Sequence, residues 1–180
     1  MSRVNVHRIP VLSDNYSYLV EDTTERTCVI VDPAEGPPVI AEVERLGLRP
    51  VMVWNTHHHP DHVAGNRAVL DRFGSLPVYG SAGDRGRIPE LTVFLNDGDT
   101  VEFAGERAAV LFLPGHTSAH IAFHLPDSGH IFLGDVLFGY SCGKVLEGSF
   151  EDMFRSVSRV GRLPDSTQVW CGHEYTLNNL

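Results

Sequence analysis

The run Thr56-His57-His58-His59-Pro60-Asp61-His62 is the part of the sequence that most clearly indicates chemistry. It directly follows the apolar stretch 51–54, so the histidines begin where a buried strand ends. Side chains two residues apart in extended backbone point to the same side, which puts His57 and His59 together and turns His58 away. Imidazoles and a carboxylate suit zinc, iron or manganese. The run therefore predicts a metal site that uses His57, His59, Asp61 and His62.

Three further potential ligands follow apolar stretches elsewhere in the chain. His116 follows 111–113, Asp135 follows 131–133 and His173 follows 169–171. One such residue alone is more often a turn or capping residue. In stacked sheets, however, strand ends meet at one edge, and together with the first run they give seven ligands, more than one zinc usually takes. We therefore expect two metals that share Asp135 as a bridging carboxylate.

The elements that would position these residues are mostly short strands. Stretches rich in β-branched and aromatic residues, bounded by turn residues, predict roughly ten strands. Three helices are expected: 37–46, ended by Gly47; 66–73; and one after the N-cap Ser149, with Met153, Phe154, Val157 and Val160 on its apolar face. Buried strands need cover on both faces, so two sheets with outer helix layers are favoured. The length predicts one domain over residues 1–180.

Composition excludes several classes of protein. The 180 residues hold 14 Lys and Arg against 23 Asp and Glu, a formal net charge of -9, which disfavours nucleic-acid binding and a nuclease. No apolar stretch reaches the length of a membrane span or a signal peptide. Three widely spaced cysteines do not suggest a disulfide framework, so a cytoplasmic protein is expected.

The motifs also resemble those of a known family. T-H-H-H-P-D-H, P-G-H-T, G-D and G-H-E-Y-T occur in the order and at the separations typical of the metallo-β-lactamase superfamily of binuclear hydrolases. Cys142-Gly143-Lys144 with Glu147-Gly148, and the stretch 171–176, are similar to glyoxalase II, the hydroxyacylglutathione hydrolases. The resemblance covers essentially the whole chain. It implies an α/β (α+β) αββα sandwich, with two mixed β-sheets flanked by helices.

The resemblance also assigns residues to roles. One metal would be bound by His57, His59 and His116, and the second by Asp61, His62 and His173, with Asp135 between them. Zinc is favoured, with iron or manganese as alternatives. Lys144 and Tyr175 match positions that contact glutathione; the competing interpretations are a solvated charge and a packing aromatic.

The sequence departs from the family pattern at three places. Leu146 stands where a glutathione-contacting tyrosine is common, and Val136 stands where a threonine commonly follows the bridging aspartate. Family members also continue past the position of Leu180 into a helical region with basic residues. Either a shortened form or a naturally short relative with a more open site is expected.

The implied activity is thioester hydrolysis of S-(2-hydroxyacyl)glutathione, such as S-D-lactoylglutathione, within methylglyoxal detoxification. Two divalent metals would lower the pKa of a shared water to about 7. Asp61 and Asp135 would orient the resulting hydroxide for attack, and the thiolate would leave without a separate acid. Cys142 and Cys171 are interpreted as buried packing residues rather than nucleophiles.

Other functions stay open at this point. A persulfide dioxygenase on the same fold would use one iron held by His57, His116 and Asp135. A lactonase or β-lactamase-type hydrolase would suit an open site, and a metal-binding module would show no turnover. The expected partner is a small-molecule glutathione thioester, with no nucleic acid and no membrane. The sequence does not determine the oligomeric state, and a monomer is favoured.

Overall fold

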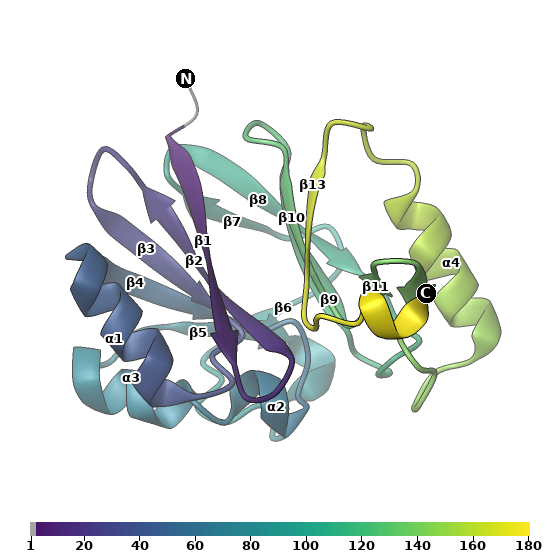
Figure 1. Cartoon of the computed structure of the whole chain (residues 1–180), viewed down its shortest axis with the longest axis horizontal. Helices are drawn as coiled ribbons and strands as arrows, with labels where there is room; N and C mark the ends of the chain where they lie inside the picture. The colour runs from purple at the N-terminus through teal and green to yellow at the C-terminus, as the bar shows by residue number, and fades with distance from the viewer. Residues whose placement is uncertain (1–2) are drawn as a thin grey trace.

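The chain, described here over residues 3–180 by a computed structural model, is built as four layers (Figure 1). Helices cover both outer faces of two stacked sheets. The strands are β1 (Val4–Val11), β2 (Asn15–Asp22), β3 (Thr27–Val31), β4 (Arg49–Trp54), β5 (Val78–Ser81), β6 (Val93–Leu95), β7 (Thr100–Phe103), β8 (Glu106–Phe112), β9 (Ile121–Leu125), β10 (His130–Gly134), β11 (Leu137–Phe138), β12 (Ser141–Cys142) and β13 (Gln168–Cys171). The helices are α1 (Gly36–Leu46), α2 (Pro60–Val63), α3 (Asn66–Phe73), α4 (Phe150–Val160) and the 3₁₀ turns η1 (Ala82–Asp84) and η2 (Leu177–Asn179).

Both large sheets are mixed, as predicted. The first has the order β1-β2-β3-β4-β5-β6, antiparallel from β1 to β3 and parallel from β3 to β6. The second has the order β13-β10-β9-β8-β7, in which only β10 and β13 pair in parallel. A small hairpin, β11–β12, lies beside α4 (Figure 1). The αββα sandwich and the fold class are confirmed.

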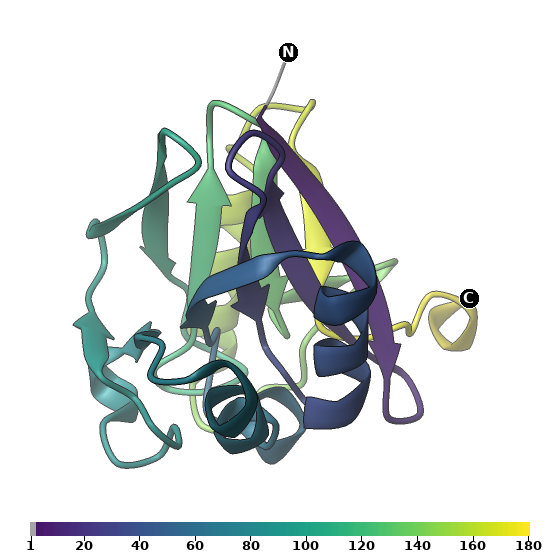
Figure 2. The same ribbon diagram turned by 90° about the vertical axis from the view of Figure 1, so that its left-hand side faces the viewer.

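Three apolar clusters hold the layers together. Between the sheets, the Trp54 ring stacks on Phe123 with centroids 4.5 Å apart, and Tyr18 and Phe132 pack around them. A second cluster lies under α1 and α3, which cover the first sheet (Figure 2). The third lies between the second sheet and α4 and includes Met153. Because these clusters fix both sheets, the loops at the strand ends have a rigid base.

The helix ends follow the sequence signals. Gly47 adopts φ 63°, the left-handed conformation that ends α1. Ser149 caps α4: its hydroxyl accepts from the Asp152 amide, and the Asp152 carboxylate accepts from the Ser149 amide.

The structure differs from the sequence-based elements in detail. Residues 3–180 contain thirteen strands and four α-helices, against roughly ten and three expected. Asp61 and His62 lie in the one-turn helix α2, an element that was not expected from the sequence and that Pro60 starts. Phe154, expected on the apolar face of α4, is 73% exposed. The prediction of one domain over 1–180 includes two residues outside those described and stays a prediction.

Adjacent residues of α4 should respond very differently to truncation. Met153 is 4% exposed in the cluster under α4, so Met153→Ala is expected to lower the free energy of unfolding by about 2 kcal/mol. Phe154→Ala removes an exposed ring and should change it by about 0.5 kcal/mol or less. Urea denaturation of both variants is the measurement, and equal losses would show that Phe154 is buried in solution.

Among the helices of residues 3–180, none combines the length and apolar character needed to cross a membrane.

Candidate metal centre

All seven predicted ligands come together where the two sheets meet. The backbone joins the sheets there: Ile121 N–H donates to Thr56 C=O at 2.9 Å, and Tyr16 N–H donates to Gly172 C=O at 2.8 Å. These side chains form three overlapping groups, and within each group the ligand atoms lie within 4.8 Å of one another. The groups are His57, His59 and His116; His57, His62 and Asp135; and Asp61, His62 and His173. The first and third match the two expected ligand sets, and the second contains the expected bridge.

Asp135 lies at the centre of this arrangement. One carboxylate oxygen is 3.4 Å from His62 Nε2, and the other is 3.3 Å from both His116 Nε2 and His173 Nε2. Burial opposes ionisation, but His62 and His173 outweigh it and hold the pKa of Asp135 well below its usual range. A buried, ionised carboxylate among imidazoles can bridge two cations.

Hydrogen bonds at the outer nitrogens orient four of the imidazoles. The Nδ1 atoms of His62, His116 and His173 lie 3.1 Å from Asp32, 2.8 Å from the Lys144 carbonyl and 2.9 Å from Asp14, respectively. These acceptors fix a proton on Nδ1, so Nε2 is the nitrogen that faces the cluster and can bind a cation once it is deprotonated.

The fourth oriented ring, His57, is arranged in the same way through Thr56. The Thr56 hydroxyl donates to Asp32 at 2.7 Å, so it accepts from His57 Nδ1 at 3.1 Å. Burial lowers the pKa of His57 well below its ordinary value, so the ring is neutral. The fifth ligand ring, His59, turns Nδ1 inward, 3.1 Å from His116 Nε2.

The polar atoms that face the centre fit bound cations. Within residues 3–180, His57 Nε2, His62 Nε2 and Asp135 Oδ1 are buried without a hydrogen-bond partner. Leaving such groups unsatisfied costs about 1–3 kcal/mol each, more for charged ones. A Cβ atom at Gly172 would collide with the Asp135 carboxylate and the His62 ring, so glycine keeps this space open. The residues present therefore suit divalent metal ions.

Several residues that support the ligands were not identified from the sequence. Asp32 accepts from Thr56 N–H at 2.8 Å as well as from its hydroxyl, and Asn15 donates to Asp61 at 3.0 Å. His120 stacks on His57 at 4.7 Å, and its Nε2 accepts from Asp135 N–H at 3.2 Å. Burial lowers the pKa of His120 to about 3, so this ring is neutral. The only sequence signal for Asp32 is its position after the apolar strand β3.

The predicted substrate residues lie at the rim. Tyr175 stacks on His173 with centroids 4.8 Å apart, and the Lys144 side chain is exposed. Lys144 is the only lysine of the chain. His58 belongs to none of the three groups and faces Asp84 and Glu147 instead. Cys142 is exposed, so its interpretation as buried packing is wrong, whereas Cys171 is partly buried.

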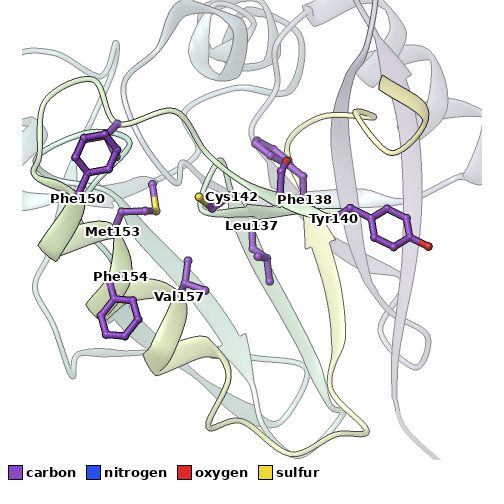
Figure 3. Close-up of a pocket in the computed structure, with 10 residues that line it drawn as sticks. Leu137, Phe138, Tyr140, Cys142, Phe150, Met153, Phe154 and Val157 are labelled. Carbon is purple, nitrogen blue, oxygen red and sulfur yellow. The ribbon is translucent and has the colours of Figure 1, made fainter. Parts of the chain in front are cut away.

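An apolar groove of about 450 Å³ borders the site between α4 and the β11–β12 hairpin (Figure 3). Phe138 belongs to both regions, since it lines the groove and its ring lies 5.0 Å from Tyr175. Cys142 and Met153 face each other across the groove (Figure 3). The rim of the metal centre is therefore polar at Lys144 and apolar towards α4.

The free energy of unfolding of the metal-stripped protein should fall as the pH rises, because His173 loses its proton. Burial lowers the pKa of this imidazole, but Asp135, Asp61 and Asp14 raise it to about 10. The unfolded value is about 6.5, so the protonated ring stabilises the fold fully below about pH 6.5, and this contribution disappears as the pH rises through about 10. Urea unfolding at about pH 6 and pH 9 should show the loss. His173→Gln should flatten this pH dependence, and an unchanged slope would contradict the assignment.

Comparison with known proteins agrees with this geometry. A profile of the metallo-beta-lactamase superfamily matches residues 11–173. Hydroxyacylglutathione hydrolase from Gloeobacter violaceus is 54% identical, and the match covers 97% of this chain and 69% of the relative. The protein of the same name from Synechococcus sp. (strain JA-2-3B'a(2-13)) is 51% identical, with 98% and 70% covered.

Solved structures show the same fold. ETHE1 from Myxococcus xanthus is 30% identical with a TM-score of 0.82, covering 95% of this chain and 76% of that one. TTHA1623, solved in a di-iron-bound form, is also 30% identical with a TM-score of 0.75, covering 94% and 92%. Both matches span nearly all of this chain.

Proposed function

Because this chain belongs to the metallo-beta-lactamase superfamily and, within it, to the hydroxyacylglutathione hydrolases, we propose that it hydrolyses S-(2-hydroxyacyl)glutathione, such as S-D-lactoylglutathione, to glutathione and a 2-hydroxy acid. The observation that carries the proposal is the convergence of seven ligand-type side chains into three overlapping groups. That arrangement suits hydrolysis at a pair of cations.

The proposed cofactors are two divalent ions, with zinc favoured over iron and manganese. His57, His59 and His116 would hold one ion; Asp61, His62 and His173 would hold the other; and Asp135 would join them. When bound, such ions activate water for attack and polarise the thioester carbonyl.

The two carboxylates have the protonation state that the proposed roles need. The hydrogen bond from His173 lowers the pKa of Asp61 below its usual range, and Asn15 adds a second hydrogen bond. Asp61 and Asp135 are therefore ionised at neutral pH and can accept a hydrogen bond from an attacking water and so orient it. A thiol leaving group with a pKa of about 8.5 departs as the thiolate without a general acid.

Steady-state hydrolysis of S-D-lactoylglutathione, beside a matched thioester without glutathione, tests the proposal. We expect kcat/KM to favour the glutathione ester by about tenfold or more, which corresponds to about 1.4 kcal/mol. Metal analysis of the same sample should give two divalent ions per chain. Equal rates would reduce the function to a generic thioesterase. One iron per chain with oxygen uptake would support the persulfide dioxygenase. Preferred turnover of lactones or β-lactams would support a lactonase or β-lactamase-type hydrolase.

Lys144 provides a specific test of glutathione recognition. Its side chain is exposed, while its carbonyl holds His116, so Lys144→Met removes the charge and keeps the backbone contact. We expect KM for the glutathione ester to rise about tenfold, because a hydrogen bond to a charged group contributes about 1.5–3 kcal/mol. kcat, and the rate with the ester lacking glutathione, should stay the same. A fall in kcat with both substrates would place Lys144 outside substrate recognition.

The proposal extends to the protein's location and assembly. All three cysteines are free, which agrees with a reducing compartment, and we propose a cytoplasmic enzyme that acts as a monomer.

A further inference from the structure

The segment after β5 buries a charged network that the proposed reaction does not use. Asp84, at the end of η1, is fully buried. A buried carboxylate needs a partner, and Arg87 supplies one: its Nε and one terminal nitrogen donate to Asp84 Oδ1 at 2.9 and 2.6 Å. The other terminal nitrogen of Arg87 donates to both oxygens of Glu147, at 2.9 and 3.1 Å. One guanidinium thus joins two carboxylates that are 63 positions apart.

Glu147 extends this network to the segment that carries His116. Its Oε2 accepts from both the N–H and the hydroxyl of Ser118, at 2.9 Å each. Burial opposes ionisation of Glu147, but Ser118 and Arg87 lower its pKa to about 2, so it is charged. The Glu147 amide also lies 3.4 Å from the His116 carbonyl. The loop after Lys144 is therefore fastened to the backbone on both sides of Thr117.

The same two carboxylates lie against the segment that carries His57 and His59. His58, which lies between these residues, places Nδ1 3.2 Å from Asp84 and Nε2 3.4 Å from Glu147. Its ring thus stands between the two acids that Arg87 joins. Both segments that supply the first ligand set therefore contact one network, the His116 segment through hydrogen bonds and the His57–His59 segment through the His58 ring.

The second ligand set has separate supports. Asp32 faces His62, Asp14 faces His173, and Asn15 donates to Asp61. No hydrogen bond or ion pair of the described part of the chain joins Asp84, Arg87 or Glu147 to Asp61, His62 or His173. Apart from Asp32, which also accepts from Thr56 beside His57, the surroundings of the two expected ions are therefore divided between different residues.

We propose that Asp84, Arg87 and Glu147 form a positioning triad that sets the geometry of the His57–His59–His116 ligand set and not that of the Asp61–His62–His173 set. This inference rests on the proposed binuclear function, because it concerns the binding of one of its two ions. The three residues are positioning residues: they act through His58 and Ser118 and do not touch the reacting atoms.

Cobalt titration of the metal-stripped protein, residues 1–180, tests the triad. Binding is followed by visible absorption and by competition with a chelator. His59→Ala identifies the binding step that belongs to the first ligand set. Arg87→Ala should weaken that step by about 10–100-fold, the usual effect of losing an outer partner of a ligand, and leave the other step within about threefold. Arg87→Lys should recover only part of the affinity, because lysine cannot join both carboxylates through a planar fork.

Arg67→Ala is the matched control. Arg67 also pairs with two carboxylates, Asp71 and Glu90, but on the surface of α3. It should leave both cobalt steps unchanged. Glu147→Gln, which keeps the side-chain shape, should show the same selectivity as Arg87→Ala and replaces it if that variant does not fold.

Two results would overturn the triad. If the variants weaken both steps equally, or lower only the thermal stability with both steps unchanged, the network is merely structural.

The wild-type protein tests the proposed function separately. If it binds two ions but hydrolyses no thioester, the function fails and the triad can still be judged. If it hydrolyses the thioester but the Arg87 and Glu147 variants are not selective, only the triad fails.

Discussion

Asp135→Ala should remove at least one metal ion and nearly all thioester hydrolysis. The Asp135 carboxylate lies 3.3 or 3.4 Å from the Nε2 atoms of His62, His116 and His173. His116 belongs to the first ligand set, and His62 and His173 belong to the second. Removing it leaves three imidazoles on one side, and Asp61 with two imidazoles on the other, without the carboxylate between them. Metal assistance supplies several kcal/mol of transition-state stabilisation, so kcat/KM should fall about a thousandfold or more.

Metal analysis and steady-state kinetics on the same preparation measure this effect. Glu106→Gln is the control, because Glu106 is a buried carboxylate at the far end of β8, where it accepts from Ser128 N–H at 3.1 Å. It should keep both ions and full activity. Two tightly held ions in Asp135→Ala would show that this carboxylate does not bridge.

The layered fold follows from short-range patterns in the sequence. Trp54 ends an apolar stretch and is buried between the sheets, and Ser149 with Asp152 forms the helix start that the spacing indicates. Phe154 was misplaced because helical periodicity shows which residues share a face but not how far the neighbouring layer extends. α4 covers the second sheet with Met153 and leaves Phe154 beside the open groove.

The candidate ligands were identifiable because each combines a metal-binding side chain with a position just after an apolar strand. Among the residues that orient them, Asp84 carries no such mark, and Asp32 carries the same mark although it belongs to neither ligand set. Asp32 and Asp84 are two of twelve aspartates, and only the folded chain brings them to His62 and His58. Supporting contacts depend on sheet stacking, which sequence spacing alone does not specify.

Asp32→Asn tests whether these supporting contacts matter, and its effect should be large. Asp32 adopts φ 45°, a left-handed conformation that asparagine also tolerates, so backbone strain would not explain a loss. The carboxylate accepts from the Thr56 amide and hydroxyl and faces His62 Nδ1 at 3.1 Å. An amide presents donor hydrogens on one side, so at least one of these donors would lose its acceptor, at a cost of about 1–3 kcal/mol in stability.

Because Asp32 fixes the Nδ1 proton of His62, the loss should be concentrated in the second ligand set. We expect metal affinity there to fall about 10–100-fold, with a similar loss of kcat/KM. Cobalt titration would show the weakened step to be the one that Arg87→Ala leaves intact. Asp71→Asn, at an exposed aspartate of α3, should change neither step. If Asp32→Asn weakened only the first set, the division of the supporting residues between the two ions would be wrong, because Asp32 reaches the first set only indirectly, through the amide and hydroxyl of Thr56.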